Sequence, residues 1–406
     1  MLKAYLLAQI EEDTRRAAAN RVWKKTIVDL VSWGEDQDSE RDATMIKAWL
    51  RSQYSETIRD RKAGSIDKDW ELIGTSFHRW LRENAQRVGV GNEKGNVRFI
   101  TEAFPFFADA YRKILDASAS YTSGWEPVFY NAQNDFTWQS TVVLAPLMVT
   151  DDADTVRRKI NAVATYLDIW IMRRVSNYVR VGYSSASYTM FTLARDIRQK
   201  PLPELVATLT DKLNADSKEV SFDGYPARDR GGIAQLGLNQ FSGRYIFHML
   251  ARLTSYIEVA AGKPDLFDKY VDRTVKNPQD IEHITADVFS KFGGGFASEH
   301  DFCFWFWDWR NGIGGLLLLP ADVNRSLQAR CYAYKARKYV GQNLFAATLT
   351  RQAYMNQPQF TRFIEANGLP FAHYDKFGTA EQHERTELVR LLCHKVWSPD
   401  RLASFL

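Results

Sequence analysis

The strongest constraint on the fold is an apolar repeat of three to four residues that runs through the first half of the chain. The opening segment carries apolar side chains at this spacing, at Leu2, Leu6, Ile10, Val22, Ile27, Leu30 and Val31. Such a repeat is typical of amphipathic α-helices that bury one face. The same pattern recurs at 41–61, 69–86, 97–117, 138–148 and 153–173. We therefore expect residues 1–230 to form a large helical domain.

The second half of the chain shows a different pattern. Pro, Gly and Asp accumulate between 199 and 235, as they do in loops, and we place a domain boundary there. Beyond it, the short runs FDKYVDRT (267–274) and GLLLLP (315–320) favour strands, and helical spacing returns afterwards. The predicted fold class is mainly α, with a small α+β domain within 231–406. Its strand–strand–helix unit should span about 267–340.

Composition limits the classes of function. The chain has 53 Lys and Arg against 49 Asp and Glu, so its net charge of +4 permits contact with a polyanion without demanding it. Cys303, Cys331 and Cys393 lie far apart, which disfavours a disulfide framework or a zinc-structured fold. No segment approaches the ~18 apolar residues of a membrane span, and the N-terminus does not resemble a signal peptide. We expect a cytoplasmic protein.

Three features of the second half suggest chemistry. Glu282 and His283 form an acid–His pair at the end of an expected strand. A Gly-rich turn and an apolar strand then lead to Asn324, where a helix is expected to begin. The segment from that point is basic, with Arg325, Arg330, Lys335, Arg337 and Lys338. A strand that ends in an acid–His pair, a second strand and a helix that carries an Asn form an arrangement typical of a metal site.

Hydrolysis of a phosphodiester needs these residue types. A neutral imidazole can deprotonate water because its pKa lies near physiological pH. A divalent cation held by a carboxylate and an Asn oxygen would neutralise the charge that develops on the phosphate. Arg330 and the neighbouring cations would hold the backbone of DNA or RNA.

Each feature alone also has a structural interpretation. A single Glu-His pair is weak support for catalysis, and His283 could be a core histidine. A Gly-rich turn before a leucine run is typical of a buried strand, and a basic helix is often a solvated face. The six aromatic residues within 302–309 could stack on bases, although core or subunit packing is the favoured role.

The segments DIEHITADVF, WRNGIGGLLLLPADVNRS and YKARKYVGQNLFAATL together resemble the C-terminal nuclease domain of GmrSD-type restriction endonucleases. That domain is a His-Me finger (HNH-like) fold built as a ββα-metal unit. These enzymes act in prokaryotic defence against foreign, often modified, DNA. The helical first half resembles the middle region of the same proteins, so the resemblance covers nearly the whole chain. It implies a metal-dependent DNA endonuclease.

The resemblance also implies roles for individual residues. His283 would be the general base, and Glu282 and Asn324 would bind a divalent metal, Mg²⁺ or Mn²⁺. Asn311 would organise the turn that supports the site. Lys335 would contact a phosphate.

Two departures from the family pattern stand out. Many relatives have Gly-Asn-Leu where this chain has Gly314, Gly315 and Leu316. Relatives also carry an N-terminal ParB-like nucleotide-binding domain with a D-G-Q-x-R motif, which this sequence lacks. We expect either a separately encoded ParB-like partner, which would make the chain the nuclease half of a split enzyme, or a remnant of a longer gene. The alternative function is a catalytically silent helical scaffold or DNA-binding subunit that retains the nuclease fold.

Overall fold

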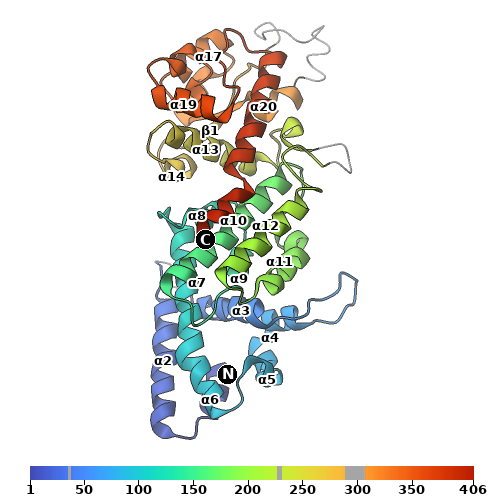
Figure 1. Ribbon diagram of the computed structural model, residues 1–406, viewed down its shortest axis with the longest axis vertical. Coiled ribbons are helices and arrows are strands. Elements are labelled where there is room, and N and C mark those ends of the chain that lie inside the picture. The colour runs from blue at the N-terminus through green and yellow to red at the C-terminus, as the bar shows by residue number, and fades with distance from the viewer. Residues whose placement is uncertain (35–37, 226–230, 289–305, 307) are drawn as a thin grey trace. The chain divides into compact units, whose positions relative to one another are not determined.

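The computed structural model describes residues 1–34, 38–225, 231–288, 306 and 308–406 (Figure 1). The chain forms two compact units. Unit 1 consists of residues 1–168, 182–211 and 400–406, and unit 2 consists of residues 169–181 and 212–399. The sequence prediction drew its boundary at 230, which lies inside unit 2.

The regular secondary structure in the described part of unit 1 is all helical. Its helices are α1 (Leu2–Leu7), α2 (Asp13–Val31), α3 (Arg41–Tyr54), α4 (Asp69–Glu83), α5 (Ala85–Val88), α6 (Glu93–Arg98), a π-helical turn (Phe99–Ala103), α7 (Phe104–Ala119), α8 (Glu126–Gln133), α9 (Gln139–Val142) and α11 (Tyr183–Ile197). Two helices, α10 (Ala153–Val175) and α12 (Leu202–Asp216), belong to both units. The 3-10 turn Pro399–Phe405 lies near the C-terminus.

The core of unit 1 is built on stacked aromatic rings. Trp49 of α3 is fully buried, and its ring centroid lies 4.7 Å from that of Phe99 and 5.1 Å from that of Phe107. Trp23 of α2 stacks on Phe104 of α7 at 4.5 Å, and these two helices run side by side (Figure 1). Large flat side chains at helical spacing therefore join α2, α3 and α7, because offset aromatic pairs add to the apolar area they bury.

Unit 2 contains the sheet of the described structure. Its elements are a 3-10 turn (Ile233–Gln235), α13 (Gly243–Ala260), α14 (Phe267–Val271), β1 (Gln279–His283), a 3-10 turn (Ile313–Gly315), β2 (Leu316–Pro320), α16 (Ala321–Leu327), α17 (Tyr332–Tyr339), α18 (Leu344–Ala347), a 3-10 turn (Arg351–Tyr354), α19 (Pro358–Asn367) and α20 (Thr379–Val396).

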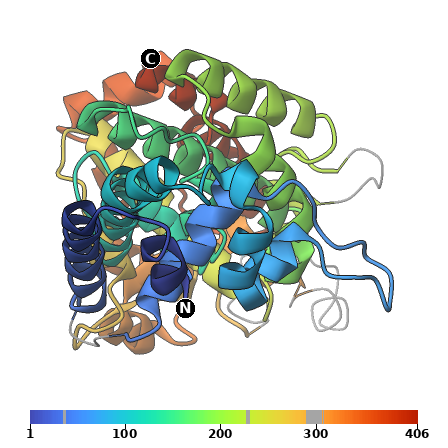
Figure 2. The same ribbon diagram turned by 90° about the horizontal axis from the view of Figure 1, so that it is seen from below.

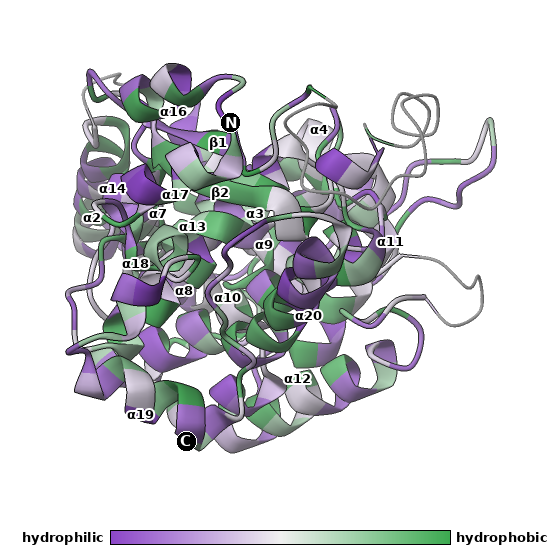
Figure 3. Ribbon diagram, turned by 90° about the horizontal axis from the view of Figure 1, so that it is seen from above, coloured by the Kyte–Doolittle hydropathy of each residue, from purple (hydrophilic) through white to green (hydrophobic). Residues whose placement is uncertain are grey.

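The sheet consists of β1 and β2 in antiparallel pairing, with Gln279 opposite Pro320 and His283 opposite Leu316. All four leucines of β2 are buried, and Figure 3 shows this strand as a hydrophobic ribbon that packs on α13 and α18. A continuous apolar run is expected of a strand that is covered on both faces. The described residues form a mainly helical fold with a small two-stranded antiparallel sheet, which confirms the mainly α part of the predicted fold class. The ββα-metal nuclease domain stays a prediction.

Some local predictions were wrong. The segment FDKYVDRT, predicted as a strand, contains helix α14 (Phe267–Val271). The helix predicted over 41–61 ends at Tyr54, and the one over 138–148 is a four-residue helix followed by buried turns. Pro146 has no N–H for a helical bond, which is consistent with the second difference. Most of the aromatic run at 302–309 lies outside the described residues.

The turn before β2 depends on close contact with α20. A Cβ atom on Gly314 would clash with the Thr386 hydroxyl and with the Gln382 carbonyl oxygen, whereas a Cβ on Gly341 would meet no atom within 4 Å. We expect Gly314→Ala to lower the free energy of unfolding by about 1–3 kcal/mol, because overpacking moves both elements. Gly341→Ala is the matched control, with little change. Chemical denaturation checks both, and equal stability of the two variants would contradict the packing.

Candidate active site

The strand pairing places His283 at the end of β1. Its backbone neighbour Ile284 donates an N–H to the Gly315 carbonyl at 2.9 Å, which extends the pairing beyond the strand. Because successive side chains in a strand point to opposite faces, Glu282 and His283 diverge. Glu282 is buried, and His283 is half-buried. The two members of the acid–His pair therefore occupy different environments.

The His283 side chain is held by Asn311, the residue that the family resemblance assigns to the supporting turn. The distance from His283 Nε2 to Asn311 Oδ1 is 2.9 Å. An amide oxygen only accepts, so Nε2 carries the hydrogen and donates it. The neutral ring then has its lone pair on Nδ1, for which the described part of the chain supplies no hydrogen-bond partner. His283 is thus oriented as a proton acceptor.

The backbone around Asn311 is fixed by a second segment of unit 2. Leu238 donates its N–H to the Asn311 carbonyl at 2.8 Å, and Ile313 donates to the Leu236 carbonyl at 2.9 Å. These two bonds flank a bridge between Gly237 and Gly312. The amide that orients His283 is therefore held at its backbone by an element more than seventy residues earlier in the sequence.

Burial and nearby cations keep His283 neutral. Burial, followed by the positive charges of Arg310 and Lys335, lowers the pKa of His283 to about 4, although the bond with Asn311 and the negative charge of Asp287 oppose this shift. Arg310 is positioned by its Nε–H, which donates to the Thr285 carbonyl at 3.1 Å. At neutral pH the imidazole is a free base beside a guanidinium.

Glu282 lies in a buried network on the other face of β1. Its Oε1 accepts from the Lys335 ammonium at 2.7 Å and from the Tyr339 hydroxyl at 3.0 Å. Glu282 is 4% exposed and Lys335 is 1% exposed. Burial raises the pKa of the Glu282 carboxyl, and the bonds from Lys335 and Tyr339 oppose that rise. The network is a closed ion pair with an added hydroxyl donor.

This network corrects two predicted roles. Glu282 faces away from His283 and already neutralises Lys335, so the two members of the acid–His pair do not face one metal ion. Lys335 was predicted to contact a phosphate, but its ammonium is buried and also donates to the His283 carbonyl at 2.7 Å. The sequence shows that the helix around Lys335 is basic. It does not show that the face of α17 that carries Lys335 packs on the sheet.

Asn324 also contacts β1. Its Nδ2 donates to the Ile281 carbonyl at 3.2 Å, so α16 and α17 each donate to one backbone carbonyl of β1, at Ile281 and His283. Carbonyls two residues apart in a strand point to the same side, so both bonds fall on the edge of β1 that does not pair with β2. Since only Nδ2 is used, the Asn324 Oδ1 remains an acceptor.

Arg330 is the one predicted phosphate contact whose side chain is exposed. Its guanidinium lies 5.2 Å from the centre of the Tyr334 ring. Arg325, Arg337 and Lys338 are also exposed. The helices after β2 therefore present cations to solvent, while Lys335 faces the core.

The oxygen-bearing side chains of the site decide whether the predicted divalent metal could bind there. Among the described residues, no three His, Cys, Asp or Glu side chains gather where they could hold one ion. The predicted pair of Glu282 and Asn324 does not fit a shared cation, because the Glu282 carboxylate is enclosed by Lys335 and Tyr339. Asn324 Oδ1 and the exposed carboxylate of Asp287, whose charge acts on His283, are two further oxygen donors.

The Gly-Gly form of the turn has a physical reason. A Cβ on Gly315 would lie 2.6 Å from Gln382 Oε1 and 3.2 Å from the Arg310 carbonyl oxygen. The side chain of Gln382 occupies the space that a residue with a side chain would need at position 315. The only amide that contacts His283 in the described structure comes from Asn311.

The sequence analysis missed two residues of the site. Tyr339 lies four residues after Lys335, which places both on one face of a helix, and this spacing could have revealed it. Arg310 is the last of the helical residues 308–310, directly before Asn311. The sequence there has no periodicity that indicates which way its side chain points.

No protein-family model matches this chain, and no curated protein matches it in sequence. None of the helices that the structure describes is long and apolar enough to cross a membrane.

The lowered pKa of His283 predicts a pH dependence of stability. The pKa is about 4 in the folded chain and about 6.5 in an unfolded one, so between these values the unfolded chain binds more protons. The neutral His283 imidazole makes its full contribution to the free energy of unfolding above pH ~6.5. This contribution is lost as the pH falls toward 4, by at most ~1.4 kcal/mol per pH unit.

Replacing His283 by Gln removes the titrating group and should flatten this part of the pH dependence. Urea denaturation at intervals between pH 4 and 7 measures it. The same slope in both proteins would show that His283 is not a buried neutral imidazole.

The buried ion pair predicts a large stability effect. Glu282→Gln or Lys335→Met should each lower the free energy of unfolding by about 3–5 kcal/mol, because each leaves an uncompensated charge in the core. The double variant should be less destabilised than the sum of the singles. A double-mutant cycle by denaturation measures the coupling. Additive single effects would mean that the two side chains do not interact.

Proposed function

We propose that this chain is a metal-dependent DNA endonuclease of a prokaryotic defence or restriction system. The observation that supports it best is the arrangement of His283. Its imidazole is neutral, its Nε2–H is held by Asn311, and its Nδ1 is available as a base. A general base must have its acceptor atom oriented before the reaction and must be unprotonated at working pH.

In this proposal each of the named residues of unit 2 has a separate role in hydrolysis. His283 Nδ1 takes a proton from the water that attacks phosphorus, while the P–O bond to the leaving nucleotide breaks and the departing oxygen takes a proton from solvent. Asn311 keeps the ring in the required tautomer. The Arg310 guanidinium near His283 stabilises negative charge on the phosphate, since a fixed cation in a partly buried site needs no reorganisation. Exposed Arg330 and its neighbours contact the DNA backbone, which positions the substrate without selecting a sequence.

A divalent cation, Mg²⁺ or Mn²⁺, is part of the proposal because the resemblance to GmrSD-type nucleases implies it. When bound, it would neutralise charge on the scissile phosphate. The Asn324 Oδ1 remains available to such an ion, whereas the Glu282 carboxylate is enclosed by Lys335 and Tyr339. Mg²⁺ commonly uses one or two protein oxygens together with water and substrate phosphate.

The same resemblance suggests a partner. We propose a separately encoded ParB-like nucleotide-binding domain, so that this chain supplies the nuclease half of a split enzyme in the cytoplasm. Gene neighbourhood and co-purification test this part independently of the chemistry.

A second candidate function has its own support. Glu282 and Lys335, two of the predicted site residues, pair with each other in the core. This closed pair is what a catalytically silent helical scaffold or DNA-binding subunit would retain, because the pair stabilises the sheet without requiring substrate. A DNA-cleavage assay distinguishes the two functions, because only the endonuclease would cut DNA.

The test is plasmid nicking with Mg²⁺ or Mn²⁺, with and without the partner. We expect His283→Ala to reduce the cleavage rate about 10²–10⁴-fold, because a lost general base removes that much. His383→Ala is the matched control, since His383 is exposed on α20 of the same unit. EDTA should stop the wild-type reaction.

A His283→Ala variant that cleaves at the wild-type rate would overturn the role of His283 as base. Wild-type protein that binds DNA without cleaving it under any of these conditions would favour the silent scaffold. Thermal melts of each variant ensure that a lost activity is not a lost fold.

A further inference from the structure

The loop between α3 and α4 stands away from the helices of unit 1. It spans residues 55–68, and both Figure 1 and Figure 2 show it as a blue hairpin-like projection. We call residues 59–68 of this loop the finger. Nearly all of its residues are exposed. A loop of this length on a compact helical unit is commonly functional.

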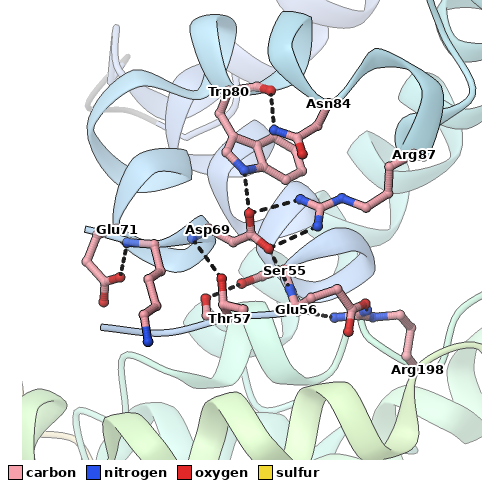
Figure 4. A network of polar contacts seen from close by, with 10 residues as sticks. Ser55, Glu56, Thr57, Asp69, Glu71, Trp80, Asn84, Arg87 and Arg198 are labelled. Carbon is pink, nitrogen blue, oxygen red and sulfur yellow. Dashed lines mark hydrogen bonds and ion pairs between the residues drawn. The ribbon is translucent and has the colours of Figure 1, made fainter. Parts of the chain in front are cut away.

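The base of the finger is held by the Asp69 carboxylate, which Figure 4 shows at the centre of a network. Asp69 accepts from the Glu56 backbone N–H at 2.9 Å, from Trp80 Nε1 at 2.8 Å, and from Arg87 at 2.9 and 3.1 Å. The bidentate Arg87 bond and the indole bond fix the start of α4, and the Glu56 bond ties the end of α3 to it.

A second carboxylate closes the finger itself. One oxygen of Glu71 accepts from the backbone N–H of Arg59 at 3.0 Å and of Lys68 at 3.2 Å, the first and last residues of the finger. The Trp70 N–H also donates to the Thr57 carbonyl at 3.1 Å. The two arms of the loop are therefore bound together, and the finger is pre-organised.

The charges of the finger leave an excess of cations. It contains four basic and two acidic residues, a net charge of +2. Both acids are paired, Asp67 with Arg59 and Asp60 with Lys68, each at 3.2 Å. Arg61 and Lys62 are exposed and have no ion-pair partner among the described residues. Two neighbouring positive charges thus remain for an external anion.

An exposed apolar side chain lies in the same finger. Ile66 is 84% exposed, and folding does not account for its position in solvent. One isoleucine offers too little apolar area for the core of a protein interface. By contrast, proteins that bind the minor groove often insert a single apolar side chain between base steps while cations hold the phosphates.

We propose that the finger is a DNA-binding element, in which Arg61 and Lys62 contact phosphates and Ile66 packs against bases in the groove. The inference rests on the proposed function, because it takes DNA as the substrate, and it adds a second contact that lies outside the nuclease unit. The finger would hold and locally deform the duplex.

The experiment uses the full chain with His283→Ala, so that DNA is bound without being cut. Anisotropy of a labelled duplex at several salt concentrations gives the slope of log affinity against log salt. We expect Arg61→Gln with Lys62→Gln to reduce this slope by about 1.8, since each phosphate contact contributes about 0.9. Ile66→Ser should keep the slope, weaken binding roughly tenfold, and abolish the fluorescence rise of 2-aminopurine that reports unstacking.

Helix α2 offers matched controls. Lys24 and Lys25 are exposed neighbours, and Val28 is 62% exposed on the same helix. Lys24→Gln with Lys25→Gln, and Val28→Ser, should leave the slope and the 2-aminopurine signal unchanged. Finger variants that bind DNA with the wild-type slope and affinity would overturn the proposal.

The outcomes separate this inference from the proposed function. If the protein with an intact His283 cleaves DNA and the finger variants bind and cleave as the wild type does, only the finger proposal fails. If binding depends on the finger while cleavage is absent, the finger proposal stands and the endonuclease proposal fails. If the wild type does not bind DNA, or the finger binds anionic vesicles instead, the finger is not a DNA-binding element.

Discussion

The ion pair between Glu282 and Lys335 is the interaction on which the arrangement of the site depends. The Lys335 ammonium contacts both the Glu282 carboxylate and the His283 carbonyl, so one side chain of α17 fixes two consecutive residues of β1. A short two-stranded sheet is marginal by itself and needs helices against it. Tyr339 completes the network from the same helix, and burial makes any missing partner costly.

With one face of β1 anchored in this way, the other face can carry a reactive group. His283 projects there, and its Nε2–H bond to Asn311 selects the tautomer. Asn311 in turn is held through backbone bonds to the segment around Leu238. Arg310 adds a positive charge that disfavours protonation of the imidazole. The buried ion pair and the proposed base therefore come from consecutive residues of a single strand, whose side chains point to opposite faces.

Sequence patterns predicted the parts of this site that depend on local periodicity. The leucine run predicted β2, the Glu-His segment predicted β1, and Asn324 does lie in the helix after β2. The pattern could not show which face of α17 packs on the sheet, so Lys335 was predicted to bind phosphate although it lies in the core. Asn311 was named for the turn, but its bond to His283 depends on segments far apart in sequence. The finger was missed because helical spacing at 41–61 continues past Tyr54, where the helix ends.

The most direct test of this account is ¹⁵N NMR of the histidine rings, with His283 assigned by comparison with His283→Gln. The account predicts a neutral ring with the proton on Nε2 at pH 7 and a titration midpoint near pH 4. A proton on Nδ1, or a midpoint near the ordinary value of about 6.5, would contradict it.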